Sequence, residues 1–361
     1  MGSIPAVHVS GSGFITEPLT DGDIEAIVLR LGFDFGWDPV WNEPITEHLW
    51  TNGRTGNSFA RIKARHTSDR ILLKWLGPRD GEATGLSAVT PTVAKYLDDL
   101  SSLFADRCPT VALAPRPLGW LEQPQVIAME FIEGTELAEV AGQPDHEFWD
   151  TPEVISGWVG SAAEALATFH DHGPTGHAVE EAAIAVLSEK LRRYRLSAVR
   201  RKDLLDYAMG PRVVAPRYQD FGPGNLLGLQ DGGIAVLDPP LELDLAPRHR
   251  DLAHFLFLIR RDLAGIDVDT RRTVGPERGM GIRRDFLASY EANSGFPVED
   301  GRGKALLAMY ESFEAFGVAR RIAAGRDYLP RSWSRWQAAA WAARTSLASR
   351  VRAVRALQIE R

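Results

Sequence analysis

Three side chains in the segment 217–240, RYQDFGPGNLLGLQDGGIAVLDPP, have the types and spacing that phosphoryl transfer requires. They are Asp220, Asn225 five residues later, and Asp238, which follows two strand-like runs joined by a glycine-rich turn. A carboxylate can accept the proton of an acceptor hydroxyl, and hard oxygen ligands can hold the magnesium that neutralises a triphosphate. We therefore predict that Asp220 is the catalytic base and that Asn225 and Asp238 bind Mg²⁺.

A second interpretation makes Asp220, as the first residue of Asp-Phe-Gly, the magnesium ligand itself. It requires an Asp-x-x-x-x-Asn pattern upstream. That pattern is missing, because the residue five places after Asp203 is alanine and the one five places after Asp206 is proline. The spacing therefore favours Asp220 as the base.

The segments that must position these residues look like strands in the first part of the chain. Segments 45–50, 58–64 and 70–76 are rich in aliphatic and aromatic residues and are separated by turn-forming stretches, which predicts an antiparallel meander. A helix is expected around residues 90–104, and a buried strand is expected within residues 124–137. We expect the strands among them to form a small sheet.

After residue 135 the patterns become helical. Residues 154–173 place apolar side chains at helical spacing, and long helical patterns fill the chain from residue 241 onward. The sequence therefore predicts an α+β fold, with a small antiparallel-sheet N-terminal lobe, a larger and mostly helical C-terminal lobe, and a ligand site in the crevice between them. The expected boundaries are 1–44 for an N-terminal extension carrying a short helix, 45–135 for the N-terminal lobe, and 136–361 for the C-terminal lobe.

The composition restricts the classes of partner. The chain has 361 residues, a formal net charge of −7 and one cysteine, Cys108, so it is a poor candidate for nucleic-acid binding and has no intrachain disulfide. No stretch approaches the roughly 18 apolar residues that a membrane span requires, and the start does not look like a signal peptide. We expect a cytoplasmic protein with a neutral or cationic partner, and the sequence leaves its oligomeric state open.

Taken together, the motifs resemble those of the aminoglycoside phosphotransferase and choline kinase group, whose fold is related to that of protein kinases. The matching segments are YQDFGPGN at 218–225, AVLD at 235–238 and the Asp-Leu-Ala that begins at Asp251. The resemblance covers roughly residues 45–258, and it implies ATP and Mg²⁺ as co-substrate and cofactor. It also implies that Asp251 braces the catalytic loop.

The resemblance extends to the expected nucleotide site in the N-terminal lobe. It implies a phosphate-binding lysine in LLKWL, a hinge in VIAMEFIEG, a phosphate-covering loop in NGRTGNS and an acidic partner for the lysine. The residues implied are Lys74, Met129 behind the adenine, the backbone of Glu130 and Ile132, then Gly53, Gly56 and Asn57. Glu82 is named as the partner of Lys74, with Asp98 and Asp99 as the alternatives. The alternatives are that Lys74 lies on an edge strand and that the glycines form only a hairpin turn.

One residue departs from the family pattern, and several others receive no chemical role. Tyr218 stands where the family usually has histidine, and we expect it to support the loop because it also offers a flat ring with a polar tip. His170 and His177 receive no chemical role. Trp333, Trp336 and Trp341 are expected to pack in the core rather than to bind ligand.

The predicted function is a kinase that acts on the hydroxyl of a small molecule. A cationic aminoglycoside would require several carboxylates, and choline, homoserine, an amino sugar or a nucleoside-like antibiotic would fit as well. The candidate carboxylates could instead form solvated helix faces; they are Glu242, Asp244, Glu291, Glu311 and Glu314. The alternative function is a catalytically inactive kinase-like module that binds a nucleotide or a partner, but the retained catalytic residues favour the enzyme.

Overall fold

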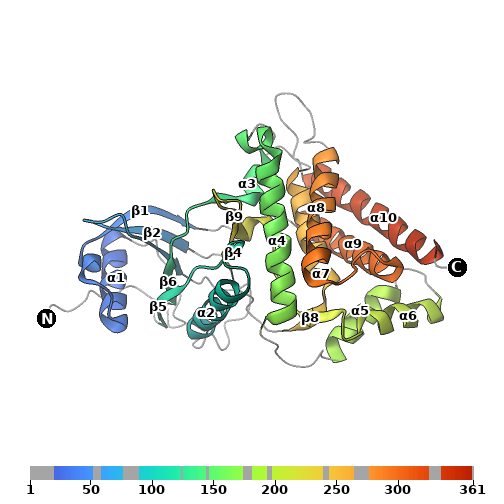
Figure 1. Cartoon of the computed structure of the whole chain (residues 1–361), viewed down its shortest axis with the longest axis horizontal. Coiled ribbons are helices and arrows are strands. Elements are labelled where there is room, and N and C mark those ends of the chain that lie inside the picture. The colour runs from blue at the N-terminus through green and yellow to red at the C-terminus, as the bar shows by residue number, and fades with distance from the viewer. Residues whose placement is uncertain are drawn as a thin grey trace. The chain divides into compact units, whose positions relative to one another are not determined.

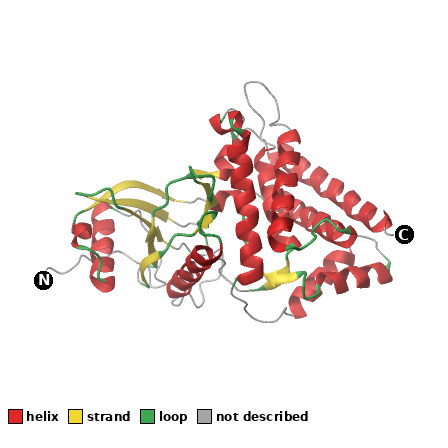
Figure 2. Ribbon diagram, in the orientation of Figure 1, coloured by secondary structure: helices red, strands yellow, loops and turns green. Residues whose placement is uncertain are grey.

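The computed structural model describes residues 20–51, 58–75, 89–122, 125–143, 146–173, 181–192, 197–238, 244–263, 276–324 and 335–359. The chain divides into two compact units. The sheet unit comprises residues 1–101 and 114–133, and the helical unit comprises residues 102–113 and 134–361. Figure 2 shows strands in both units and most of the helices in the helical unit. Among the described residues, no helix is long and apolar enough to cross a membrane.

A five-stranded antiparallel sheet forms the centre of the sheet unit, in the order β1-β2-β3-β6-β5. The strands are β1 (Pro44–Thr51), β2 (Ser58–Ala64), β3 (Arg70–Trp75), β5 (Pro117–Leu121) and β6 (Val126–Glu130). The first three form the predicted meander. The sequence did not indicate β5, because this short strand contains proline and glycine, which are both depleted in strands.

Helix α1 (Asp21–Phe35) covers one face of this sheet. Thr20 caps the helix in a capping box with Asp23. Ile24, Ile27 and Leu31 are buried in one core with side chains of the sheet. The helix that was expected within an N-terminal extension is therefore part of the core of the sheet unit. The 3₁₀ helix η1 (Pro39–Asn42) follows it.

Helix packing builds the helical unit (Figure 1). Its long helices are α4 (Pro152–His172), α7 (His249–Leu263), α8 (Pro276–Ser294), α9 (Gly301–Ala323) and α10 (Arg335–Ile359). Helix α4 packs against α8, and α9 packs against both α7 and α10. Trp341 contacts Phe257 at 5.8 Å between ring centroids, which confirms the packing role predicted for it.

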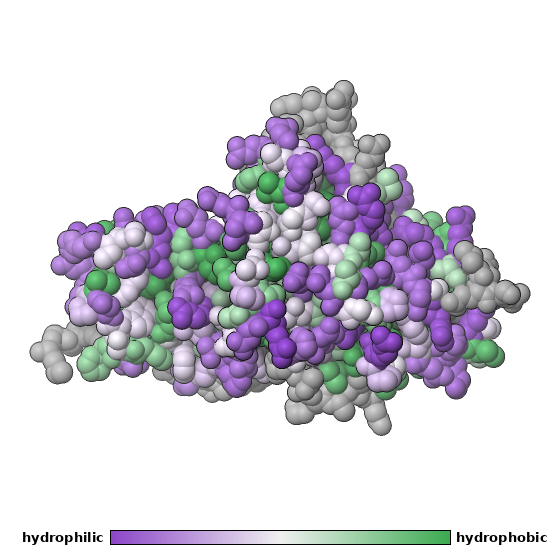
Figure 3. All heavy atoms as spheres, viewed as in Figure 1, coloured by the Kyte–Doolittle hydropathy of each residue, from purple (hydrophilic) through white to green (hydrophobic). Residues whose placement is uncertain are grey.

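The remaining helices complete the description. They are α2 (Val89–Arg107), which begins in the sheet unit, and α3 (Leu137–Gly142), η3 (Glu147–Asp150), α5 (Glu181–Arg192) and α6 (Ala198–Ala208) of the helical unit. On the face drawn in Figure 3, hydrophilic side chains predominate over the C-terminal helices, and the described residues there form no broad apolar surface.

Two small sheets in the helical unit include or adjoin the segment 217–240, which was predicted to carry the chemistry. One has the strand order β4-β10-β9-β7 and the other pairs β8 with β11. Their strands are β4 (Ala112–Leu113), β7 (Thr135–Glu136), β8 (Val214–Pro216), β9 (Leu226–Gly228), β10 (Ile234–Val236) and β11 (Leu245–Pro247). The antiparallel pair β9–β10 is the predicted hairpin, and Gly232 adopts a φ of 89° in its turn. The hairpin leads from Asn225 to Asp238.

Candidate active site

The structure brings Asp220, Asn225 and Asp238 together within the helical unit. The loop after β8 ends in the 3₁₀ helix η4 (Pro223–Asn225) and leads into β9. The Asn225 side-chain amide donates to the backbone oxygen of Asp220 at 2.9 Å, and the Leu237 amide donates to the backbone oxygen of Asn225 at 2.9 Å. These bonds connect Asn225 to Asp220 and to the residue that precedes Asp238.

A sharp turn presents Asp220 to solvent. Gln219 has a φ of 70°, the one positive φ of a non-glycine residue among the described ranges. The Asp220 amide donates to the backbone oxygen of Tyr218 at 3.0 Å, so the three residues have the form of a γ-turn. Such a conformation costs a non-glycine residue about 1–3 kcal/mol. The Asp220 side chain is 71% exposed, so its carboxylate is accessible to an acceptor.

Tyr218 supports the loop and the Asp238 segment at once. Its backbone amide donates to Oδ2 of Asp251 at 2.6 Å, and its hydroxyl donates to the backbone oxygen of Asp238 at 2.5 Å. Burial, with help from the nearby carboxylates, raises the pKa of the Tyr218 hydroxyl well above its ordinary value. The hydroxyl therefore stays protonated as a donor, and Tyr218 has the supporting contacts that were expected of it.

Asp251 anchors this loop from inside the helical unit. It is buried on α7, and Nε2 of the buried His170 lies 3.3 Å from its Oδ2. Burial opposes ionisation, but hydrogen bonds from His170 and the Tyr218 amide keep the pKa of Asp251 below its ordinary value. His170 in turn contacts the Tyr290 hydroxyl at 2.6 Å. Asp251 thus braces the loop, and His170 has a structural position.

One further residue contacts the predicted base, and a second residue contacts that one. Nε2 of His254, on α7, lies 3.2 Å from Oδ1 of Asp220, and its Nδ1 lies 3.2 Å from Oε2 of Glu314, on α9. Burial disfavours the charged ring, but the hydrogen bonds and charges of Asp220 and Glu314 raise the pKa of His254 to about 9. Sequence reasoning gave His254 no role. The available signal was a polar residue one helical turn after Asp251.

Lys74 lies at the centre of the sheet unit. It is buried on β3, between β2 and β6, so the edge-strand alternative is wrong. Ile71 and Leu73 belong to the core beneath α1, and side chains alternate along a strand, so Lys74 faces the opposite side of the sheet. Its Nζ lies 5.7 Å from the centroid of the Phe59 ring.

The predicted hinge comprises the neighbouring strand β6 and the residues that follow it. Met129 is buried and pairs with Leu72, which places it on the same face of the sheet as Lys74. The Glu130 carboxylate forms an ion pair with Arg116, and the Glu130 amide donates to the Arg116 carbonyl at 3.0 Å. Ile132 follows the strand and is half-buried.

The remaining predicted nucleotide ligands lie outside the described residues. Gly53, Gly56 and Asn57 fall in 52–57, and Glu82 falls in 76–88. The same holds for His177, Glu242 and Trp333.

The described carboxylates that were candidates for binding a cationic acceptor lie in different surroundings. Glu311 is buried between Arg283 and Arg352, so it is neither a solvated helix face nor part of an open acidic pocket. Glu291 accepts from the backbone amides of residues 298 and 299, and Asp244 contacts an arginine at 3.2 Å. Glu314 alone of these connects to Asp220.

The donor set around the loop fits a magnesium ion that also binds phosphates. The described residues contain no cluster of three or more His, Cys, Asp or Glu side chains that could hold a metal by itself. Mg²⁺ commonly takes only one or two protein ligands and completes its shell with waters and phosphate oxygens. Because the Asn225 amide nitrogen bonds to Asp220, its Oδ1 is the atom that suits a hard cation, together with the Asp238 carboxylate.

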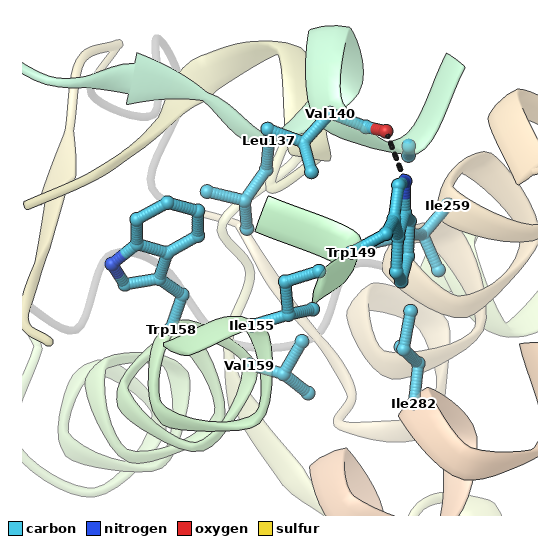
Figure 4. Close-up of a pocket in the computed structure, with 9 residues that line it drawn as sticks. Leu137, Val140, Trp149, Ile155, Trp158, Val159, Ile259 and Ile282 are labelled. Atoms are coloured by element: carbon cyan, nitrogen blue, oxygen red, sulfur yellow. Dashed lines mark hydrogen bonds between the residues drawn. The ribbon is translucent and has the colours of Figure 1, made fainter. Parts of the chain in front are cut away.

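A cavity elsewhere in the helical unit does not suit a substrate. Figure 4 shows it among Leu137, Trp158, Ile259 and neighbouring apolar side chains, where Trp149 donates to the Val140 carbonyl. Its volume is about 10 Å³, room for one water at most. An apolar lining gives such a water no partners, so the cavity belongs to the packing of α3 and α4 against α7 and α8.

Solved structures share this arrangement of elements. A choline/ethanolamine kinase family protein from Mesorhizobium loti superposes with a TM-score of 0.51 and 15% identity, covering 91% of this chain and 98% of that chain. The chain has the kinase-like fold. A glucosamine kinase superposes with a TM-score of 0.52 and 16% identity, covering 91% of this chain and 80% of that one. These matches confirm the fold that the resemblance implied. No family profile and no curated protein sequence matches the chain.

Proposed function

We propose that this protein transfers the γ-phosphate of ATP to a hydroxyl group of a small molecule. The observation that carries the proposal is the exposed Asp220 carboxylate on a braced loop that is hydrogen-bonded to Asn225 and connected to Asp238. Phosphoryl transfer depends mainly on positioning and charge control, which such a loop can supply. The kinase-like fold agrees with this activity.

In the proposed reaction, the acceptor oxygen forms a bond to the γ-phosphorus as the bond from that phosphorus to the bridging oxygen of ADP breaks. ADP leaves with the electron pair of the broken bond. Asp220 orients the acceptor hydroxyl and accepts its proton, so it must be ionised at the start of each cycle. Mg²⁺, bound through Asn225 and Asp238, would neutralise charge on the phosphates.

The sheet unit would recognise the nucleotide. Lys74 would contact the phosphates, and Met129 would pack behind the adenine on the same face of the sheet. The Glu130 amide already donates to Arg116, which leaves the Glu130 carbonyl and the Ile132 amide as the groups that bind the adenine edge. Gly53, Gly56 and Asn57 would cover the phosphates, and Glu82 would pair with Lys74.

The acceptor class that we propose is a hydroxylated amine, such as an amino alcohol, an amino sugar or an aminoglycoside. The names of the similar structures support this class, since choline, ethanolamine and glucosamine each combine a hydroxyl with a nitrogen that is or can become cationic. The chain's net negative charge agrees with a cationic acceptor.

Turnover across an acceptor panel tests the proposal. The protein is incubated with ATP and Mg²⁺ and with amino alcohols, amino sugars and aminoglycosides in turn, and ADP release and phosphorylated product are measured. We expect magnesium-dependent turnover with one acceptor class, and its loss in Asp220→Asn. Tight ATP binding without turnover on any acceptor would instead support the inactive kinase-like module and refute the proposal.

A further inference from the structure

His254 contacts two carboxylates at once, and one of them is that of the predicted base. The imidazole lies between two carboxylates on different segments, 3.2 Å from Oδ1 of Asp220 on the loop and 3.2 Å from Oε2 of Glu314 on α9. The side chains of His254 and Glu314 are mostly buried, at 18% and 24% exposed, whereas that of Asp220 is mostly exposed. Packing therefore fixes His254 and Glu314, whereas Asp220 is exposed to solvent.

This geometry requires a particular protonation state. A neutral imidazole has one N–H and can donate to only one of the two carboxylates, whereas the imidazolium donates to both. The charged groups that act on the ring are Asp220 from the loop and Glu314 from α9. Burial opposes the ionisation of Glu314, but the hydrogen bond and charge of His254 keep the pKa of Glu314 low, and Arg250, on α7, and Arg321, on α9, lower it further. Glu314 therefore remains the ionised partner that holds His254.

We propose that His254, oriented by Glu314, is a positioning residue that fixes Oδ1 of Asp220 so that Oδ2 faces the acceptor hydroxyl. The inference rests on the proposed function and assigns to it a residue outside the predicted nucleotide and metal ligands. The turn at Gln219 sets the direction of the loop, but an exposed carboxylate can still rotate about its own side-chain bonds. A charge-assisted hydrogen bond to one of its oxygens removes that freedom.

The first test is spectroscopic and does not depend on activity. The histidine ring resonances of the full chain are titrated by NMR in the wild type, in Glu314→Gln and in Asp220→Asn. Because both carboxylates raise the pKa of His254 to about 9, we expect its ring to titrate near pH 9 in the wild type. We expect that midpoint to fall by about 1 pH unit or more in each variant. Titration of the wild-type ring near its ordinary value of about 6.5 would refute the contact.

The second test is kinetic and separates positioning from a merely structural role. We expect kcat in the wild type to fall as pH rises through about 9, because the neutral ring releases one carboxylate. Glu314→Gln should move this fall to lower pH. His254→Gln should lose the fall and reduce kcat by up to about 10²-fold with little change in KM for ATP, the size expected for a misplaced catalytic group. His172→Gln, on an exposed histidine at the end of α4, is the matched control and should behave as the wild type.

The outcomes distinguish the two proposals. If the wild type is active and its kcat falls over the same pH range in Glu314→Gln, the role of His254 is refuted. The proposed phosphotransferase activity is not affected by that result. A wild type without turnover on any acceptor refutes the proposed function, and the NMR titration still decides whether His254 bridges the two carboxylates. If the fall of kcat near pH 9 moves to lower pH in Glu314→Gln and is absent from His254→Gln, the positioning role is established.

Discussion

Asp220→Asn decides between the two assignments of the Asp-Phe-Gly segment. The change keeps the shape of the side chain and removes its charge. The bonds that shape the loop use the backbone of Asp220, whose amide donates to Tyr218 and whose carbonyl accepts from Asn225. Because the carboxylate itself is 71% exposed, losing its ion pair with His254 should change the free energy of unfolding by less than about 1 kcal/mol.

The expected effect is therefore on rate rather than on folding or nucleotide binding. Removing a positioned proton acceptor typically lowers kcat by about 10²–10⁴-fold, which corresponds to about 2.7–5.4 kcal/mol of barrier. Mg-ATP should bind almost normally, since the assigned metal ligands are Asn225 and Asp238. Calorimetric titration with ATP at fixed magnesium, beside the rate on the acceptor that the panel identifies, measures both quantities on one preparation.

One combination of results would overturn the assignment. If Asp220→Asn loses Mg-ATP binding and turnover together, while Asp238→Ala binds Mg-ATP normally, then Asp220 is the metal ligand and the Asp-Phe-Gly interpretation was correct. Equal losses of Mg-ATP binding in both variants would also contradict a base that does not touch the nucleotide complex.

Three further perturbations test other parts of the structure. Asp238→Ala should weaken magnesium-dependent ATP binding by about 10- to 100-fold, and unchanged magnesium dependence would remove Asp238 from the metal site. Lys74→Met keeps the buried stem and should lower kcat by about 10²–10³-fold with an unchanged melting temperature, whereas normal kinetics would make Lys74 a structural residue. The pKa of His254 is raised from its ordinary 6.5 to about 9, so its stabilisation is complete below pH 6.5 and is lost as pH rises through 9. Urea unfolding should show a loss of about 1–2 kcal/mol over that window in the wild type and a smaller loss in His254→Gln, and equal losses would contradict the contact.

Local signals explain why much of the fold was predictable. The meander β1-β2-β3, helix α4 and the hairpin β9–β10 each follow from patterns within a few consecutive residues. The five-residue spacing from Asp220 to Asn225 is likewise local, and the hairpin explains how Asp238 returns to the same loop. The chemical roles of these residues stay predictions, although the structure brings the three together.

Contacts between distant segments were beyond sequence reasoning. His254 lies 34 residues from Asp220 and 60 residues from Glu314, and no periodicity connects the three. Glu311 illustrates the same limit, since a carboxylate on a helix carries no local sign that two arginines from other helices will surround it. Strand β5 was missed because its local composition is unfavourable for a strand. Its pairing with β6, a contact between distant segments, stabilises it nevertheless.

The buried anchors explain how the loop can hold a conformation that its own residues disfavour. The φ of Gln219 costs about 1–3 kcal/mol. The bond from the Tyr218 amide to the ionised Asp251 is worth about 1.5–3 kcal/mol, and that from the Tyr218 hydroxyl to the Asp238 carbonyl adds about 0.5–1.5 kcal/mol. These two bonds suffice to offset the strain at Gln219, and they hold both the loop before Asp220 and the backbone at Asp238. The geometry at Asp220 therefore depends on residues that never reach the solvent, and a change at Asp251 should alter catalysis by moving the loop rather than by removing a contact to substrate.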